Sequence, residues 1–327
     1  MSVNFGKVGV FFGGISSERD ISLKSGNAVC SALIKEGVDI EEIDLHTENR
    51  EDIENYLRNT HIDIAFIAMH GRFGEDGGLQ SVLENLRIPY VGSNSFASRL
   101  AMNKSASRNI FKEYNIPVPQ SITLTKSLLV DKVPNDLIIN RIKEENLDFP
   151  LVVKPQNQGS SIGVFFVDRI PQLILAIELA FSYDDNIIIE KKISGKEITV
   201  GILGDRALEP IEIRPKADFF DFNAKYTKGL TDYIIPAEIS KKTKERVQYL
   251  SLKAHRVLGC CHFSRIDLML DNDENPFILE VNTIPGFTET SLFPKAAAYE
   301  GISFSQLCIR LLEMAQRDFQ HQYANEK

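Results

Sequence analysis

The residues best suited to chemistry are two acids, an arginine and an asparagine in neighbouring β-type segments: Arg265, Asp267, Glu280 and Asn282. A short polar turn separates the two segments, and this pattern predicts a β-hairpin over residues 263–282. With the turn at its centre, Asp267 faces Glu280 and Arg265 faces Asn282. Because side chains alternate along a strand, the four polar side chains are expected on one face.

The opposite face of this hairpin is expected to be apolar and to fix the register. Its members are Ile266, Leu268, Leu270, Phe277, Leu279 and Val281. Two carboxylates about 4 Å apart repel by about 4 kcal/mol at an effective dielectric near 20. A divalent cation with Asn282 as third ligand would offset this repulsion, and oxygen ligands suit Mg²⁺. The alternative is an exposed polar face with an ordinary salt bridge. The metal site depends on the register of the hairpin, since a shift of one residue would separate the two carboxylates.

A second candidate site is the loop in residues 150–163, where an apolar strand ends at Lys154 and a Gly/Ser-rich stretch follows. The stretch contains Gly159, Ser160 and Ser161. Glycine lets backbone N–H groups approach phosphate oxygens, and Lys154 would add a positive charge. A strand follows the loop and no GK[ST] is present, so this is not a Walker A loop. The alternative is a hairpin turn with a surface lysine.

Composition limits the remaining classes of function. The chain has 327 residues, 43% hydrophobic and 25% charged, which is enough for two or three globular domains. A formal charge of −8 disfavours a nucleic-acid-binding protein. No apolar run approaches the roughly 18 residues of a membrane span, and the N-terminus lacks a signal-peptide pattern. The four cysteines lack metal-ligand spacing and are expected to be reduced thiols in a reducing, cytoplasmic compartment.

Alternation of strands and helices in the first hundred residues predicts a doubly wound parallel sheet. Ser16 and Ser17 are expected to cap the first helix. One helix is predicted over 95–115, an irregular polar segment over 124–148, and a long loop over 214–236. A loop of that length is usually either a functional lid or disordered. Domain boundaries are expected near residues 95 and 190, which gives domains 1–94, 95–189 and 190–327.

Six ordered motifs resemble those of the ATP-grasp superfamily, and within it the D-alanine–D-alanine ligase family. The motifs are Gly13–Gly26, His70–Gly78, Lys154 with Gly159–Ser161, Ala224–Tyr226, Arg265–Asp267, and Glu280–Gly286 with Ser291–Leu292. The resemblance spans the chain from the first strand to the last helix. It implies an ATP-grasp fold of three α/β domains, with the nucleotide held between the central and C-terminal domains.

The resemblance also implies residues for ATP and metal. Lys104 and Lys154 would contact the phosphates, which the backbone at Ser160 and Ser161 would cover. The adenine and ribose pocket would be lined by Glu190, Lys191, Ile193 and Glu197, although Glu190, on a buried strand, could equally be structural. Two Mg²⁺ ions, which Mn²⁺ could replace, would be held by Asp267, Glu280 and Asn282.

For the substrates, the resemblance implies that Glu18 binds the ammonium of a first D-alanine. Arg265 and the backbone N–H of Gly286 would stabilise the oxyanion. Ser291 and Leu292 would receive the carboxylate of a second D-alanine.

Three further residues complete the site that the resemblance implies. His70 would lie near the first substrate, although a His after a buried strand is more often a core residue. Lys225 would neutralise charge on the transferred phosphate. The hydroxyl of Tyr226 would bond with Ser160 and Glu18, closing the lid over the intermediate.

The activity implied is ligation of two D-alanines through a D-alanyl phosphate, for peptidoglycan precursor synthesis and hence cell-wall formation and cell shape. The expected partners are ATP, D-alanine and a second copy of the chain, as a homodimer. One alternative is another carboxylate–amine ligase of this fold, including one that uses D-lactate. Another is a catalytically silent nucleotide-binding protein, which would be free to lose residues such as Lys154 and Arg265.

Overall fold

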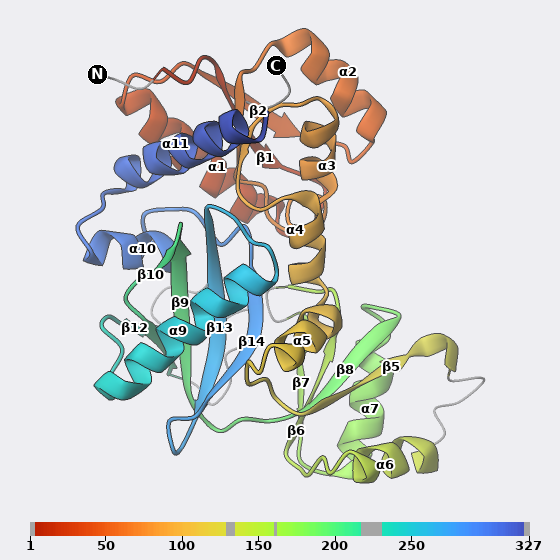
Figure 1. The fold of residues 1–327 in the computed structure, drawn as a ribbon. Coiled ribbons are helices and arrows are strands. Elements are labelled where there is room, and N and C mark those ends of the chain that lie inside the picture. The colour runs from red at the N-terminus through yellow and green to blue at the C-terminus, as the bar shows by residue number, and fades with distance from the viewer. Residues whose placement is uncertain (1–3, 129–134, 160–161, 217–230, 324–327) are drawn as a thin grey trace.

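The computed structural model describes residues 4–128, 135–159, 162–216 and 231–323, and this part of the chain forms three β-sheets (Figure 1). The N-terminal sheet lies at the top of the view. The central sheet and the C-terminal sheet lie below it, side by side. These sheets fit the predicted three-part α/β architecture. We propose that the division into 1–94, 95–189 and 190–327 reflects the three sheets.

The N-terminal sheet is parallel throughout. Its strands, in spatial order, are β2 (Ile40–Leu45), β1 (Val8–Gly13), β3 (Ile64–Ile67) and β4 (Tyr90–Val91). The helices beside it are α1 (Arg19–Lys35), α2 (Arg50–Thr60) and α3 (Gly78–Asn85). Strands β1 and β3 are buried along their whole length. Burial on both faces explains their continuous apolar runs, and the predicted doubly wound sheet is confirmed.

Helix α11 (Phe304–Tyr323), the last helix of the chain, packs against α1 on one face of this N-terminal sheet. Helices α2 and α3 pack on the opposite face. The end of the chain therefore contributes to the core formed by its beginning. As a consequence, the first and third sheets share one hydrophobic cluster.

The central sheet is antiparallel and covered by helices on one face. Its strands, in order, are β5 (Ser121–Thr125), β8 (Asn186–Lys191), β6 (Leu151–Pro155) and β7 (Phe165–Val167). The covering helices are α6 (Asn135–Glu144) and α7 (Ile170–Ala180), and a 3₁₀ turn at Lys126–Leu128 follows β5. The prediction that residues 124–148 are irregular was therefore wrong in part, because this segment contains the end of β5 and all of α6.

The C-terminal sheet is built around the predicted hairpin. Its strands, in order, are β12 (Thr231–Ile234), β11 (Ile211–Pro215), β9 (Gly195–Leu203), β13 (Phe263–Asp271) and β14 (Pro276–Asn282), with β10 (Arg206–Ala207) paired to β9. Helix α9 (Lys241–Val257) packs on its apolar face, and α10 (Leu292–Tyr299) follows the hairpin. Strands β11 and β12 pair with each other. The predicted loop 214–236 is thus shorter at both ends, and residues 217–230 lie outside the described part.

The predicted single helix over 95–115 is two helices, α4 (Ser95–Met102) and α5 (Lys104–Glu113). Asn103 interrupts them, because its backbone is extended and its side chain accepts the N–H of Ala106 at 2.9 Å. An asparagine in this conformation is a typical N-cap. The break places Lys104 in the first turn of α5.

The predicted serine cap of α1 was also wrong. The residue at the N-cap position is Glu18, and its side chain forms no capping hydrogen bond. Ser16 instead accepts the N–H of Glu18 at 3.3 Å. The turn before α1 is therefore stabilised by Ser16, while the Glu18 side chain points elsewhere.

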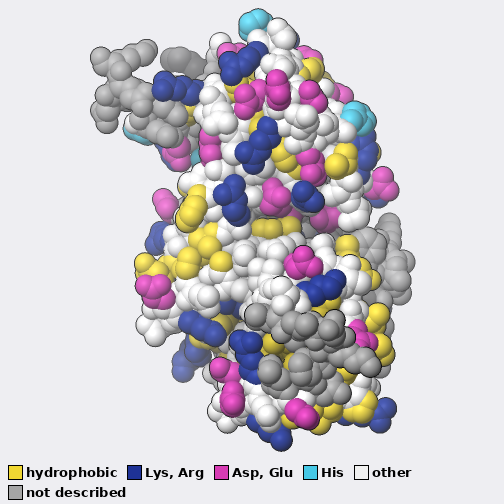
Figure 2. All heavy atoms as spheres, turned by 90° about the vertical axis from the view of Figure 1, so that its right-hand side faces the viewer, with side chains coloured by type: hydrophobic (Ala, Val, Ile, Leu, Met, Phe, Trp, Pro, Cys, Tyr) yellow, Lys and Arg dark blue, Asp and Glu magenta, His cyan; other side chains and the backbone are white. Residues whose placement is uncertain are grey.

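On the face of the molecule seen in Figure 2, Lys and Arg side chains are interspersed with Asp and Glu side chains. None of the helices in the described residues is long and apolar enough to cross a membrane.

Candidate active site

The predicted pairing of the hairpin formed by β13 and β14 is confirmed. Arg265 faces Asn282 and Asp267 faces Glu280. Beyond Asp267 a β-bulge shifts the register, so that Leu268 faces Ile278. The extra residue is Leu279.

The bulge corrects the predicted apolar face of the hairpin. Ile278, not Phe277 and Leu279, packs with Ile266 and Leu268 in the core under α9. Leu279 instead lines a cleft together with Met269 of β13. A bulge inserts one residue and reverses which face the following side chains occupy.

That cleft has a volume of about 670 Å³ and lies between the central and C-terminal sheets. Apolar side chains from both sheets line it: Val152, Phe166, Met269 and Leu279. The sequence-predicted residues on its wall are Lys104, Lys154, Glu190, Lys191, Ile193, Glu197, Asp267 and Glu280. An apolar cleft with a few converging charged groups is the usual form of a small-molecule site.

Lys104 connects the two sides of the cleft. Its buried ammonium donates to the carbonyl of Gln158 at 2.7 Å, in the predicted phosphate loop. It also lies 3.2 Å from Glu280 on β14. One cation therefore joins the predicted phosphate loop to the hairpin.

Lys154 belongs to a buried charge cluster on the central sheet. Its ammonium lies 2.8 Å from Glu190, which also contacts Arg108 of α5. Burial lowers the pKa of Lys154, and the charge of Glu190 offsets this only in part. Burial also disfavours ionised Glu190, but Arg108 and Lys154 outweigh it and lower its pKa. The cluster thus combines two cations and one ionised carboxylate.

Asp267 of the hairpin accepts four hydrogen bonds from neighbouring side chains. Arg265 donates to both of its oxygens, at 2.9 and 2.6 Å. The amide of Asn282 donates to it at 3.0 Å, and the hydroxyl of Thr199 on β9 at 2.6 Å. Within the described residues, no group of three or more His, Cys, Asp and Glu side chains converges as a metal site. The predicted third oxygen ligand, Asn282, belongs to none of these types.

Glu18, from the loop before α1, lies next to the phosphate loop. A Cβ built on Gly159 would be 3.8 Å from a Glu18 carboxylate oxygen, and one on Gly71 would be 2.9 Å from it. The side chain therefore reaches from the N-terminal sheet toward the cleft. The predicted partners Ser160 and Tyr226 lie outside the described residues.

The residues Ser161, Lys225 and Ala224 also lie outside the described part, so their predicted roles stay predictions.

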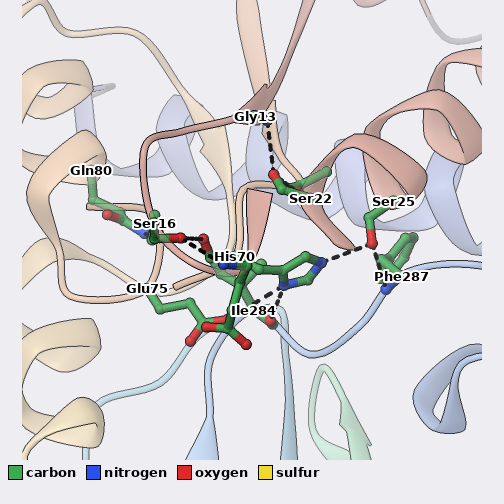
Figure 3. A network of polar contacts seen from close by, with 12 residues as sticks. Gly13, Ser16, Ser22, Ser25, His70, Glu75, Gln80, Ile284 and Phe287 are labelled. Carbon is green, nitrogen blue, oxygen red and sulfur yellow. Dashed lines mark hydrogen bonds and ion pairs between the residues drawn. The ribbon is translucent and has the colours of Figure 1, made fainter. Parts of the chain in front are cut away.

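His70 is fully enclosed in a polar network between the first and third sheets (Figure 3). Its Nδ1 lies 3.1 Å from the carbonyl of Ile284 and 3.4 Å from Glu75. Its Nε2 lies 2.8 Å from the hydroxyl of Ser25. The imidazole thus contacts the loop that follows β14.

The same loop contains the predicted oxyanion donor and the start of α10. A Cβ built on Gly286 would lie 3.3 Å from the hydroxyl of Ser291. Ser291 is the N-cap of α10 and Leu292 is its first residue. Because a helix N-terminus favours anions, this position suits a carboxylate.

Several residues at the site were missed at the level of sequence. Arg108 could have been found, because it follows Lys104 by one helical turn and both side chains are buried. Thr199 and Ser25 gave no local signal, since each contacts a residue that is distant in sequence. Met269 and Leu279 were read as ordinary strand residues.

The cleft lies between two antiparallel sheets. It contains buried lysines and an opposed acidic pair, with an arginine beside the pair. This arrangement defines a nucleotide-dependent ligase of the ATP-grasp class. Comparison with known proteins agrees. The profile "D-ala D-ala ligase C-terminus" matches residues 110–313, and "D-ala D-ala ligase N-terminus" matches residues 44–93.

A D-alanine–D-alanine ligase of Desulforamulus reducens is 42% identical, over 94% of this chain and 98% of its own length. The crystal structure of D-alanine–D-alanine ligase from Bacillus anthracis complexed with ATP superimposes with a TM-score of 0.83 at 35% identity, covering 97% and 99%. The VanG D-Ala:D-Ser ligase of Enterococcus faecalis has a TM-score of 0.81 at 30% identity, covering 94% and 99%. The chain belongs to the D-alanine–D-alanine ligase family.

Proposed function

We propose that this protein joins two D-alanine molecules to D-alanyl-D-alanine, with conversion of ATP to ADP and phosphate. The observation that carries the proposal is one cleft in which buried Lys104 and Lys154 face the opposed pair Asp267 and Glu280. This arrangement suits transfer of a phosphoryl group to a carboxylate. The names of the relatives support D-alanine as the substrate.

ATP would lie in the cleft with its base between the apolar side chains of the two sheets. Val152 comes from the central sheet and Met269 and Leu279 from the hairpin. Lys104 and Lys154 would hold the phosphates, since both residues are buried and line the cleft. Their charges would then stabilise the negative charge that shifts to the phosphates during transfer.

The hairpin residues fit Mg²⁺. Asp267 and Glu280 lie opposite one another on adjacent strands, and Asn282 contacts Asp267 through its amide. These are hard oxygen donors, and the cations Lys104 and Arg265 now balance their charge. When bound, Mg²⁺ supplies Lewis-acid stabilisation of the phosphate oxygens. Asp267, Glu280 and Asn282 would hold it.

The first D-alanine would bind with its ammonium at Glu18. Its carboxylate oxygen attacks the γ-phosphorus, ADP leaves, and D-alanyl phosphate forms. The second D-alanine, bound by its carboxylate at Ser291 and Leu292, attacks the carbonyl carbon through its neutral amine. Arg265 and the N–H of Gly286 would stabilise the oxyanion until the C–O bond to phosphate breaks, and the departing phosphate would take up the proton that the amine loses.

The carbonyl of D-alanyl phosphate is prone to hydrolysis, so water must be excluded while it exists. Glu18 lies beside Gly159, so a side chain from the N-terminal part of the chain would help to shield the phosphate loop from water. We also propose that the reaction takes place in the cytoplasm, where ATP is available and the four free thiols would stay reduced. A homodimer is proposed on the resemblance alone, and sedimentation equilibrium tests it.

The experiment that tests the function is a product assay with ATP and Mg²⁺. D-alanine is offered alone or together with D-serine, D-lactate or L-alanine, and both phosphate and the ligated product are measured. D-Alanyl-D-alanine should be the main product from D-alanine alone. If D-serine or D-lactate is present and the mixed product forms in preference to D-alanyl-D-alanine, the protein is instead a ligase with a different second substrate. ADP formation without any ligated product would contradict the proposal.

A further inference from the structure

Ser25 of α1 is one of the buried side chains that hold the loop after β14 against the N-terminal sheet. This serine is fully buried. Its hydroxyl accepts the backbone N–H of Phe287 at 3.2 Å and lies 2.8 Å from Nε2 of His70 (Figure 3). It therefore joins a helix near the beginning of the chain to a loop near its end.

The direction of these hydrogen bonds follows from the partners. The carbonyl of Ile284 only accepts, so Nδ1 of His70 carries a hydrogen and donates to it at 3.1 Å. In a neutral imidazole, Nε2 is then the acceptor, and the Ser25 hydroxyl donates to it. The oxygen of Ser25 keeps a lone pair for the N–H of Phe287. Each group in the chain from Ile284 through His70 and Ser25 to Phe287 is satisfied.

These two contacts hold both ends of one tetrapeptide. His70 binds the carbonyl of Ile284, and Ser25 binds the N–H of Phe287. Between them lie Pro285, whose ring fixes φ, and Gly286, whose backbone is otherwise the freest of any residue. With both flanking peptide planes held, the direction of the Gly286 N–H is fixed.

The ring of Phe287 is anchored separately. It packs edge-on against Phe66 at 5.5 Å and against Phe263 at 5.7 Å between ring centroids. Packing of the ring positions the Cα atom but leaves the peptide plane before it free to rotate. The hydrogen bond to Ser25 removes that rotation.

We propose that Ser25 is a positioning residue for the ligation step, because it holds the Gly286–Phe287 peptide, which follows the peptide that carries the Gly286 N–H. This inference rests on the proposed function, in which that N–H stabilises the oxyanion. Ser25 itself touches no substrate. Its removal should therefore affect turnover and the loop, and leave binding of ATP in the distant cleft unchanged.

The chain offers a matched control, Ser22, on the same helix. Ser22 is equally buried and also makes two hydrogen bonds, accepting from the N–H of Gly13 at 2.9 Å and donating to the carbonyl of Ala68 at 3.2 Å. Those contacts join β1 to the end of β3 and do not involve the loop after β14. Ser22→Ala and Ser25→Ala thus remove the same atom from similar surroundings.

The test compares both variants by amide hydrogen exchange and by steady-state kinetics on the whole protein. In Ser25→Ala the Phe287 amide should exchange at least tenfold faster than in Ser22→Ala. The kcat for dipeptide formation should be about tenfold lower in Ser25→Ala than in Ser22→Ala. This loss is smaller than the loss caused by removing an oxyanion donor itself. The KM for ATP should agree between the two variants within about twofold.

Equal exchange of the Phe287 amide in the two variants would overturn the inference, and so would faster exchange with an equal kcat. If Ser25→Ala does not fold, Ser25→Cys keeps the side-chain volume with a much weaker hydrogen-bonding group and should show the same changes, reduced in size. Failure of the unmodified protein to make dipeptide would contradict the proposed function instead. The exchange measurement needs no activity and would still decide whether Ser25 holds the loop.

Discussion

Glu190 contacts two buried cations, Arg108 and Lys154, and this makes Glu190→Gln an informative change. The exposed fractions of the side chains are 5% for Glu190, 2% for Arg108 and 9% for Lys154. At the 2.8 Å between Lys154 and Glu190, the attraction is about 6 kcal/mol at an effective dielectric near 20. Glutamine keeps the volume and removes the charge.

Removing one partner from a buried pair typically destabilises a protein by about 3–5 kcal/mol, because the remaining charge is left uncompensated. We expect a loss of that size in the free energy of unfolding at pH 7. Arg108 cannot lose its proton, but Lys154 can, and burial already lowers its pKa. In the variant its pKa falls further below that of the unfolded chain, so the stability gap to the unmodified protein should narrow as pH rises from 7 to 9.

The assay is urea denaturation followed by circular dichroism, with Glu212→Gln as the matched control. Glu212 is also buried, but its partners Arg214 and Lys196 are 47% and 39% exposed and can turn to water. That variant should lose only about 1 kcal/mol. Equal losses in the two variants, or a gap that widens with pH, would refute the account of the buried cluster.

Three further predictions concern the hairpin and a buried histidine. Glu280→Gln should abolish turnover at any Mg²⁺ concentration while circular dichroism stays unchanged, because one metal-binding charge is lost without a change in volume. Near-normal turnover at saturating Mg²⁺ would show that Glu280 is not a metal ligand. Arg265→Lys should lower kcat by about two to three orders of magnitude, because lysine lacks the planar donor pair; a loss under about fivefold would leave Arg265 as a structural partner of Asp267. His255 is buried against Ser264, and burial lowers its pKa to about 4 from 6.5. The unfolded chain then binds the proton more tightly, so up to about 3 kcal/mol of stability is lost as pH falls from 6.5 to 4. His255→Gln should remove that part of the pH dependence in urea titrations, and an unchanged slope would exclude His255 as its source.

The sequence predicted the hairpin pairing correctly because alternation of polar and apolar residues constrains it strongly. It failed to predict the bulge, since Ile278 and Leu279 are both aliphatic and either one could face the core. The break at Asn103 was missed for a similar reason. A helical pattern continues on both sides of it, and only the extended backbone and the cap to Ala106 reveal it.

Some polar contacts of the site could be predicted from the sequence and others could not. Arg108 lies one turn from Lys104, so helical spacing alone could have suggested a shared cluster. Ser25 could not be found so, because its partner Phe287 is 262 residues away. Long-range contacts of this kind depend on how α11 and the loop after β14 return to the N-terminal sheet.

The central claim is that a D-alanine carboxylate oxygen attacks the γ-phosphate and later leaves with it. The most direct measurement uses D-alanine labelled with ¹⁸O in both carboxylate oxygens, together with unlabelled ATP and Mg²⁺. Mass spectrometry of the released phosphate should find one ¹⁸O atom per phosphate for each dipeptide formed, because the bond broken in the second step is the one between the carbonyl carbon and that oxygen. Dipeptide formed together with unlabelled phosphate would contradict the acyl-phosphate route.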